Sequence, residues 1–140
     1  MSELKINHVA VLVCVIIMHA LGFLWYGQLF GAQWMGMVGL DMATAQANAP
    51  GAEVWVLNFI SSVVPLYMLA WLFTKLNVNT GVQGALIGFL ITFSFHHLPE
   101  MNNNMFAQAP NGLAWITGGY SMVAITLSGF ILGAWKKKKQ

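Results

Sequence analysis

Long apolar runs alternate with short polar stretches along this chain. Four runs contain no Asp, Glu, Lys or Arg, and they are His8–Gly31, Val54–Thr74, Gly81–Pro99 and Gly112–Trp135. Each approaches the ~20 residues that an α-helix needs to cross the hydrocarbon of a bilayer. The pattern predicts an all-α protein, an integral membrane four-helix bundle in one transmembrane domain over residues 1–140. The predicted spans are about 8–30, 54–74, 81–98 and 113–135.

The composition also favours a membrane location. Hydrophobic residues make up 58% and charged residues 7% of the sequence, whereas soluble domains carry about a quarter of charged residues. A net charge of +2 gives no basis for nucleic-acid binding. The single cysteine, Cys14, excludes an intramolecular disulfide. The lipid bilayer is therefore the first expected partner.

The charged residues predict an orientation. The chain has no arginine, and its six lysines are Lys5, Lys75 and Lys136–Lys139. With four spans, these positions fall at the N-terminus, the second connection and the C-terminus, which share one side of the membrane. The first and third connections carry Asp41, Glu53 and Glu100 but no lysine. Because lysine concentrates on the cytoplasmic side, both termini are expected to be cytoplasmic (N-in/C-in).

An interfacial segment is expected between the first and second helices. The first apolar run ends in aromatic residues that usually lie at headgroup level, so Trp25, Tyr26 and Trp34 are expected to be interfacial anchors. The stretch Gln28–Pro50 then mixes apolar and polar residues. Asp41 is suited to cap a short helix that ends before Pro50.

Two segments of this region resemble a known family. Asn7–Val13 reads NHVAVLV and Leu24–Met35 reads LWYGQLFGAQWM. Together with the Gly84–Gly88 region and the tail from Gly118 to Trp135, they resemble small bacterial membrane proteins catalogued as domain of unknown function number 1761. The resemblance implies a four-span fold in the bacterial inner membrane, and it implies no activity.

The third run predicts a helix that changes character near its end. Gly84, Gly88, Thr92 and His96 are spaced by four residues and form a row of mostly small side chains. Pro99 disfavours helix at Leu98, so the helix is expected to end there, with Glu100 just beyond it. His97 follows the apolar side of the helix and is expected to face lipid headgroups.

Small residues predict where helices approach closely. Gly84 and Gly88 on the third helix, and Gly129 and Gly133 on the fourth, have the four-residue spacing that permits tight packing in lipid. One bundle of four helices is not expected to use every such surface. The chain is therefore predicted to form a homo-oligomer or to pack against other membrane subunits.

Polar residues from all four helices are expected to gather in the outer half of the bundle, because hydrocarbon penalises unpaired polar groups. The candidates for a ligand-binding cluster are His19, Asn58, Ser61, Thr92, His96, Thr117 and Ser121. On straight helices that end as predicted, His19 and His96 differ in depth by ~13 Å.

Three interpretations of this cluster are open. The preferred one is packing, with the polar groups bonding across helices. The second is an outward-facing vestibule that binds a small polar ligand or a proton. The third is a transition-metal site in which His96 is joined by His19, His97 or Glu100, because histidine is the commonest ligand of such metals. No other cofactor is predicted.

The sequence gives little support to catalysis. It contains no HExxH, no CxxC, no phosphate-binding glycine loop and no plausible Ser/His/Asp set. No enzymatic activity is expected. A structural or accessory subunit is the first functional hypothesis, and a small-ligand, proton or metal binding or transport module is the alternative. A continuous transport path is not favoured, since no charged residue lies within a predicted span.

Overall fold

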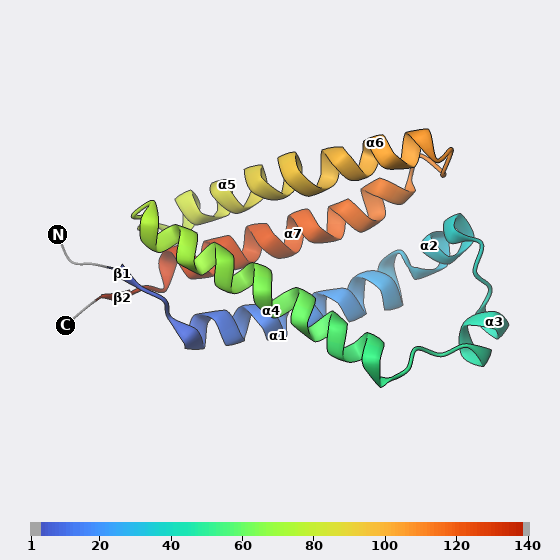
Figure 1. The fold of residues 1–140 in the computed structure, drawn as a ribbon, viewed down its shortest axis with the longest axis horizontal. Coiled ribbons are helices and arrows are strands. Elements are labelled where there is room, and N and C mark those ends of the chain that lie inside the picture. The colour runs from blue at the N-terminus through green and yellow to red at the C-terminus, as the bar shows by residue number, and fades with distance from the viewer. Residues whose placement is uncertain (1–3, 139–140) are drawn as a thin grey trace.

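The computed structural model describes residues 4–138 and is all-α apart from one pair of two-residue strands. Long helices run back and forth along one axis, and short helices follow the first of them in the connection to the second (Figure 1). Two π-helical turns, η1 and η2, interrupt the first and third long helices. In chain order the elements are β1 (Leu4–Lys5), α1 (His8–Leu24), η1 (Trp25–Leu29), α2 (Gly31–Val38), α3 (Met42–Ala47), α4 (Ala52–Lys75), α5 (Gly81–Thr92), η2 (Phe93–His97), α6 (Leu98–Phe106), α7 (Leu113–Ala134) and β2 (Lys137–Lys138).

Four helices are long and apolar enough to cross a membrane. They are His8–Leu29, Ala52–Lys75, Gly81–Phe106 and Leu113–Ala134. Large apolar side chains such as Leu12, Val82 and Phe106 point outward from the bundle. Such a surface is unfavourable in water and favourable in lipid. The predicted all-α fold with four apolar helices is confirmed, and the chain is a multi-pass membrane protein.

The two described chain ends lie together at one end of the bundle (Figure 1). β1 pairs antiparallel with β2. Asn7 caps α1 by accepting hydrogen bonds from two backbone N–H groups of its first turn. The amide nitrogen of Asn7 also donates to the carbonyl of Trp135, 3.2 Å away, at the end of α7. These contacts hold the start of α1 against the end of α7.

Helix α7 is the central element of the bundle. It packs against α1, α4 and α5, and its N-terminal part also contacts α6. The apolar core lies between these helices on the side of the termini, where Cys14, Leu66 and Ala124 are completely buried. Helices α4 and α5 diverge from their connecting turn toward the other end of the bundle (Figure 1).

Glycines allow α5 and α7 to touch backbone to backbone. A Cβ atom at Gly88 would lie 2.7 Å from the carbonyl oxygen of Ile125, and one at Gly129 would overlap the carbonyl of Gly84. A Cβ at Gly133 would overlap the carbonyl of Thr80. The two small-residue rows therefore pack against each other within one chain. Homo-oligomerisation itself stays a prediction. The glycines from which it was predicted, however, already pack against another helix of the same chain.

The third helix does not end at Leu98, and that prediction is wrong. The helix continues through η2 and α6 to Phe106. Pro99 lies just after the π-helical turn, and local π-helical adjustments of this kind accommodate proline within a membrane helix. The continuation brings Glu100 inside the span Gly81–Phe106, so a charged residue does lie within a candidate span.

The connection between α1 and α4 is largely helical. Helix α2 ends at Gly39, whose positive φ of 71° suits a residue without a side chain. Asp41 caps α3 as predicted, since its carboxylate accepts a hydrogen bond of 2.8 Å from the backbone N–H of Thr44. The same bond holds the pKa of Asp41 below its ordinary value. The placement of this segment at a membrane interface stays a prediction.

Candidate functional site

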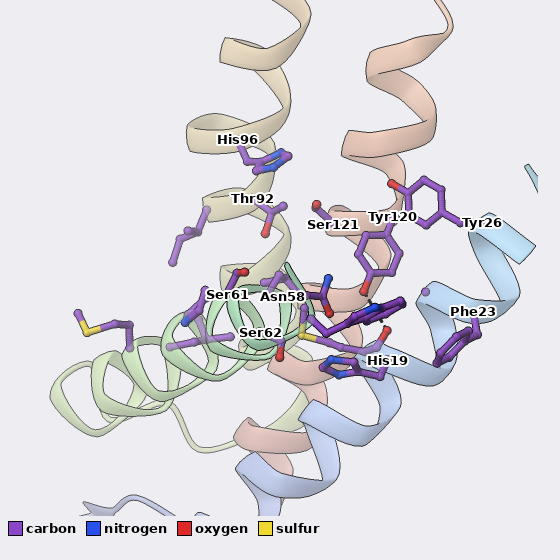
Figure 2. A pocket seen from close by; sticks show the side chains of 18 of the residues that line it. His19, Phe23, Tyr26, Asn58, Ser61, Ser62, Thr92, His96, Tyr120 and Ser121 are labelled. Carbon is purple, nitrogen blue, oxygen red and sulfur yellow. Dashed lines mark hydrogen bonds between the residues drawn. The ribbon is translucent and has the colours of Figure 1, made fainter. Parts of the chain in front are cut away.

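A partly open cavity of about 850 Å³ lies among the four long helices. Figure 2 shows polar side chains reaching it from α1, α4, α5 with η2, and α7. On α1, α5 and α7 the lining residues are close to the middle of each span. Pockets of 300–1,000 Å³ are the usual size for small-molecule sites. The cavity is therefore large enough for an organic ligand of moderate size.

Six of the seven candidate ligand-binding residues line this cavity. They are His19, Asn58, Ser61, Thr92, His96 and Ser121. The seventh, Thr117, does not line it and instead donates a hydrogen bond to the carboxylate of Glu100. The polar residues of four separate helices thus meet in one place, and their role in binding a ligand stays a prediction.

The cluster lies near mid-height of the helices and not in their outer half. The reason is the continuation of the third helix, which adds residues 99–106 beyond the predicted end. At 1.5 Å per residue this places Thr92 and His96 about 12 Å deeper than expected. The predicted depth difference between His96 and His19 is nearly removed, and both residues reach the same cavity.

His96 and Glu100 form a pair at the cavity wall. Nδ1 of His96 lies 3.5 Å from Oε2 of Glu100, one helical turn further along the chain. The His96 side chain is 51% exposed and lines the cavity, whereas the Glu100 side chain is 24% exposed and does not line it. Ionisable residues within a membrane span are costly and are commonly functional. This pair is the main ionisable feature beside the cavity.

His97 does not face lipid headgroups, and that prediction is wrong. It is completely buried, with its ring against α7 and its centroid 4.6 Å from that of Trp115. The π-helical turn is the reason, because it inserts one extra residue between Thr92 and the next residue on the buried side. The buried row of α5 therefore continues from Thr92 to His97 with a step of five residues, and His96 turns to the cavity.

The proposed metal ligands do not converge. His97 packs on Gly118, while His96 reaches the cavity, so of the predicted set the structure pairs only His96 with Glu100. In the part of the chain that the structure describes, no group of three His, Cys, Asp or Glu residues could hold a metal ion. The geometry therefore does not favour the metal interpretation.

Sequence reasoning missed several residues of the cavity. Ser62 lies beside Ser61 and also lines it, and Tyr120 crosses from α7 to donate a 2.8 Å hydrogen bond to the carbonyl of Met18. Tyr26 reaches the same space from η1. The sequence signal for Tyr120 was its phenol within the fourth apolar run. Aromatic residues in membrane helices are common, however, and their presence alone did not distinguish the cavity from the lipid-facing surface.

The predicted interfacial anchors Trp25 and Tyr26 make contacts inside the protein. The indole N–H of Trp25 donates to the carbonyl of Ile116 on α7 over 2.9 Å. The ring of Tyr26 lies between Trp34 and Tyr120, with centroid distances of 5.7 and 5.6 Å. These contacts hold η1 against α7, and Tyr26 and Tyr120 both line the cavity. The headgroup-level position of the three aromatic residues stays a prediction.

The fold and the cavity define a class: multi-pass membrane proteins of four long helices with a ligand-sized space at mid-height. Within that class, the family described as "Protein of unknown function (DUF1761)" matches residues 9–133. The match covers most of the chain and confirms the predicted resemblance, so the chain belongs to this family. Comparison with curated proteins and with solved structures gives no match.

Proposed function

We propose that this protein is a membrane-embedded binding protein whose cavity takes up a small, lipid-soluble molecule carrying a polar group. The observation that carries the proposal is the cavity of about 850 Å³, which combines apolar walls with polar side chains from four helices. Binding sites are typically mostly apolar, with a few convergent polar groups that orient the ligand. Polar groups that served only as packing would not need to surround an open space of this size.

The position of the cavity suits a ligand that arrives from the membrane. Both α4 and α5 contribute to its wall, yet these helices diverge from their connecting turn (Figure 1). The main contacts of α4 are with α1 and α7. A ligand dissolved in the bilayer would therefore enter between α4 and α5.

The alternative role as a structural or accessory subunit has less support. The small-residue rows that favoured self-association are used between α5 and α7 of one chain. We further propose that binding occurs without catalysis, in the bacterial inner membrane, with both termini cytoplasmic. The lysines at the end of the bundle that holds the termini support this orientation.

The first test is retention of pyrene, a neutral apolar probe, by the purified protein. Native mass spectrometry after removal of the detergent micelle would count the molecules bound. Wild type is expected to retain one pyrene. The variant Ser61→Phe/Ser121→Phe places two rings in the cavity from opposite walls and is expected to bind at least about tenfold more weakly, a difference of ~1.4 kcal/mol.

A matched control carries the same new side chains on the same two helices but outside the cavity. Val64→Phe/Val123→Phe fits this purpose, because both positions are exposed and neither lines the cavity. This control should bind pyrene as wild type does. Equal retention by all three proteins, or none by wild type, would contradict the proposed function.

A further inference from the structure

Most polar groups on the cavity wall have already used their hydrogen-bonding proton. Each of the following donates to a backbone carbonyl, which can only accept: Ser61 to Leu57, Ser62 to Phe59 at 2.7 Å, Thr92 to Gly88 at 2.8 Å, Ser121 to Thr117 at 3.4 Å, Tyr120 to Met18 at 2.8 Å, and Nδ1 of His19 to Val15 at 2.9 Å. A hydroxyl has one proton, so these oxygens have only lone pairs left to offer. In a neutral imidazole with a protonated Nδ1, Nε2 is likewise an acceptor.

The cavity wall therefore offers more free hydrogen-bond acceptors than free donors. Asn58 retains an amide group that can donate, and Tyr26 and His96 have N–H or O–H groups not committed to a carbonyl (Figure 2). The indole N–H groups of Trp55 and Trp71 on the lining can also donate. A ligand that supplies several N–H donors would satisfy the wall without breaking any intrahelical bond. A ligand that can only accept hydrogen bonds, such as a carboxylate, would face the lone pairs of these oxygens and form no hydrogen bond with them.

Two further features of the site favour a positive charge. Oε2 of Glu100 lies 3.5 Å from Nδ1 of the cavity-lining His96, and it is buried with no hydrogen bond among the described residues. The rings of Phe23, Trp55 and Tyr26 also line the cavity, and aromatic faces attract cations. No lysine lines the cavity among the described residues, and Nζ of Lys75 lies over the ring of the lining residue Trp71, 5.8 Å from its centroid.

We propose that the ligand class of this cavity is small amphipathic amines, bound as alkylammonium ions with an apolar body. The inference rests on the proposed function and names its ligand. An ammonium group brings three donors and no acceptor, which complements the lone pairs of the wall. Its charge is offset by Glu100, and its apolar body packs on the aromatic and aliphatic lining.

The test uses three probes with the same body and different head groups: phenylbutylammonium, phenylbutanol and phenylbutyrate. Binding is measured by isothermal titration calorimetry in lipid nanodiscs at about pH 8, where the amine is protonated and the acid ionised. Empty nanodiscs and the Ser61→Phe/Ser121→Phe variant serve as blanks for partition into lipid. The ammonium is expected to bind at least about tenfold more tightly than the alcohol, and the carboxylate most weakly.

Glu100→Gln tests the charge, since an amide retains a carbonyl oxygen that can accept from Thr117. It should weaken ammonium binding about tenfold and leave alcohol binding within about twofold. Glu53→Gln, which changes an acidic residue that does not line the cavity, should alter neither. A thermal unfolding scan of each variant checks that it is folded.

The possible outcomes separate this inference from the proposed function. Equal binding of ammonium and alcohol, tighter binding of the carboxylate, or no effect of Glu100→Gln would overturn the amine assignment. So would failure of all three probes to bind. In each of those cases retention of pyrene would still support the cavity as a binding site, and its loss from wild type would refute the proposed function separately.

Discussion

His97 is a buried imidazole whose two ring nitrogens have no hydrogen-bond partner in the described part of the chain. An unpartnered buried polar group costs about 1–3 kcal/mol. Its contact with Trp115, at a centroid distance of 4.6 Å, offsets part of this cost. The ring fits only because Gly118 on α7 has no side chain, since a Cβ there would overlap Nδ1 of His97.

Gly118→Ala is therefore expected to destabilise the protein by about 1–3 kcal/mol, the usual cost of overpacking a tight contact. Stability can be measured by circular dichroism during titration of mixed micelles with sodium dodecyl sulfate. Gly36→Ala is the control, because a Cβ at Gly36 meets nothing within 4 Å. In a protein that already carries His97→Ala, the further change Gly118→Ala should cost much less stability, because the ring that the new Cβ would overlap is absent. A fully stable Gly118→Ala protein would contradict the described contact.

The two adjacent histidines also show how far a sequence can predict single residues. A four-residue repeat correctly predicted that Gly84, Gly88 and Thr92 share a side, and Thr92 is indeed buried beside the two glycines. It then placed His96 on the same row. The π-helical turn of η2 shifts that row by one residue. The shift falls between two adjacent residues of the same type, so the periodicity could not tell which of His96 and His97 is buried.

At the scale of elements, the contact between α5 and α7 depends on backbone proximity. The glycine rows were predictable because four-residue spacing of small residues is a recognised mode of close packing in lipid. Their partner was not predictable, since such a row fits another helix of the same chain or of a second chain equally well. The short connection from Phe106 to Leu113 turns α7 back along α6 and α5, and this connectivity decides the pairing.

Gly129→Leu should consequently separate α5 from α7 and destabilise the single chain by about 1–3 kcal/mol or more. The same unfolding titration measures the loss. Ala134→Leu lies on the same helix at an exposed position and should leave stability within about 0.5 kcal/mol of wild type. If Gly129→Leu changed the native mass in detergent but left the unfolding stability constant, the contact between the glycine rows of α5 and α7 would instead lie between two chains.

At the scale of the whole molecule, the residues that line the cavity were more predictable than the volume and depth of the cavity. Polar side chains in four apolar helices must turn away from lipid, which is why residues as distant in sequence as His19 and Ser121 reach one cavity. The volume of the cavity depends on the divergence of α4 from α5, which no pattern within either helix specifies. The predicted depth of the cavity depended on where the third helix ends. Pro99 suggested an end at Leu98, whereas the helix continues to Phe106.

The arrangement of charge in the whole molecule leads to a prediction of orientation. The antiparallel order of the four long helices puts Lys5, Lys75 and Lys136 at the end of the bundle that holds both termini (Figure 1). The connections at the opposite end contain Asp41 but no lysine. Since lysine-rich connections are retained in the cytoplasm, the end with the termini should be cytoplasmic.

Reporter fusions can measure this orientation directly. Green fluorescent protein fused after Gln140 is expected to fluoresce, because it folds in the cytoplasm, and alkaline phosphatase at the same site should be inactive. Alkaline phosphatase inserted after Asn48 or Asn111, in the two connections at the far end, should be active because those connections face the oxidising side where its disulfides form. A fluorescent insertion at Asn111 together with an active phosphatase at Gln140 would reverse the orientation, and Lys5, Lys75 and the lysine tail would then need another role.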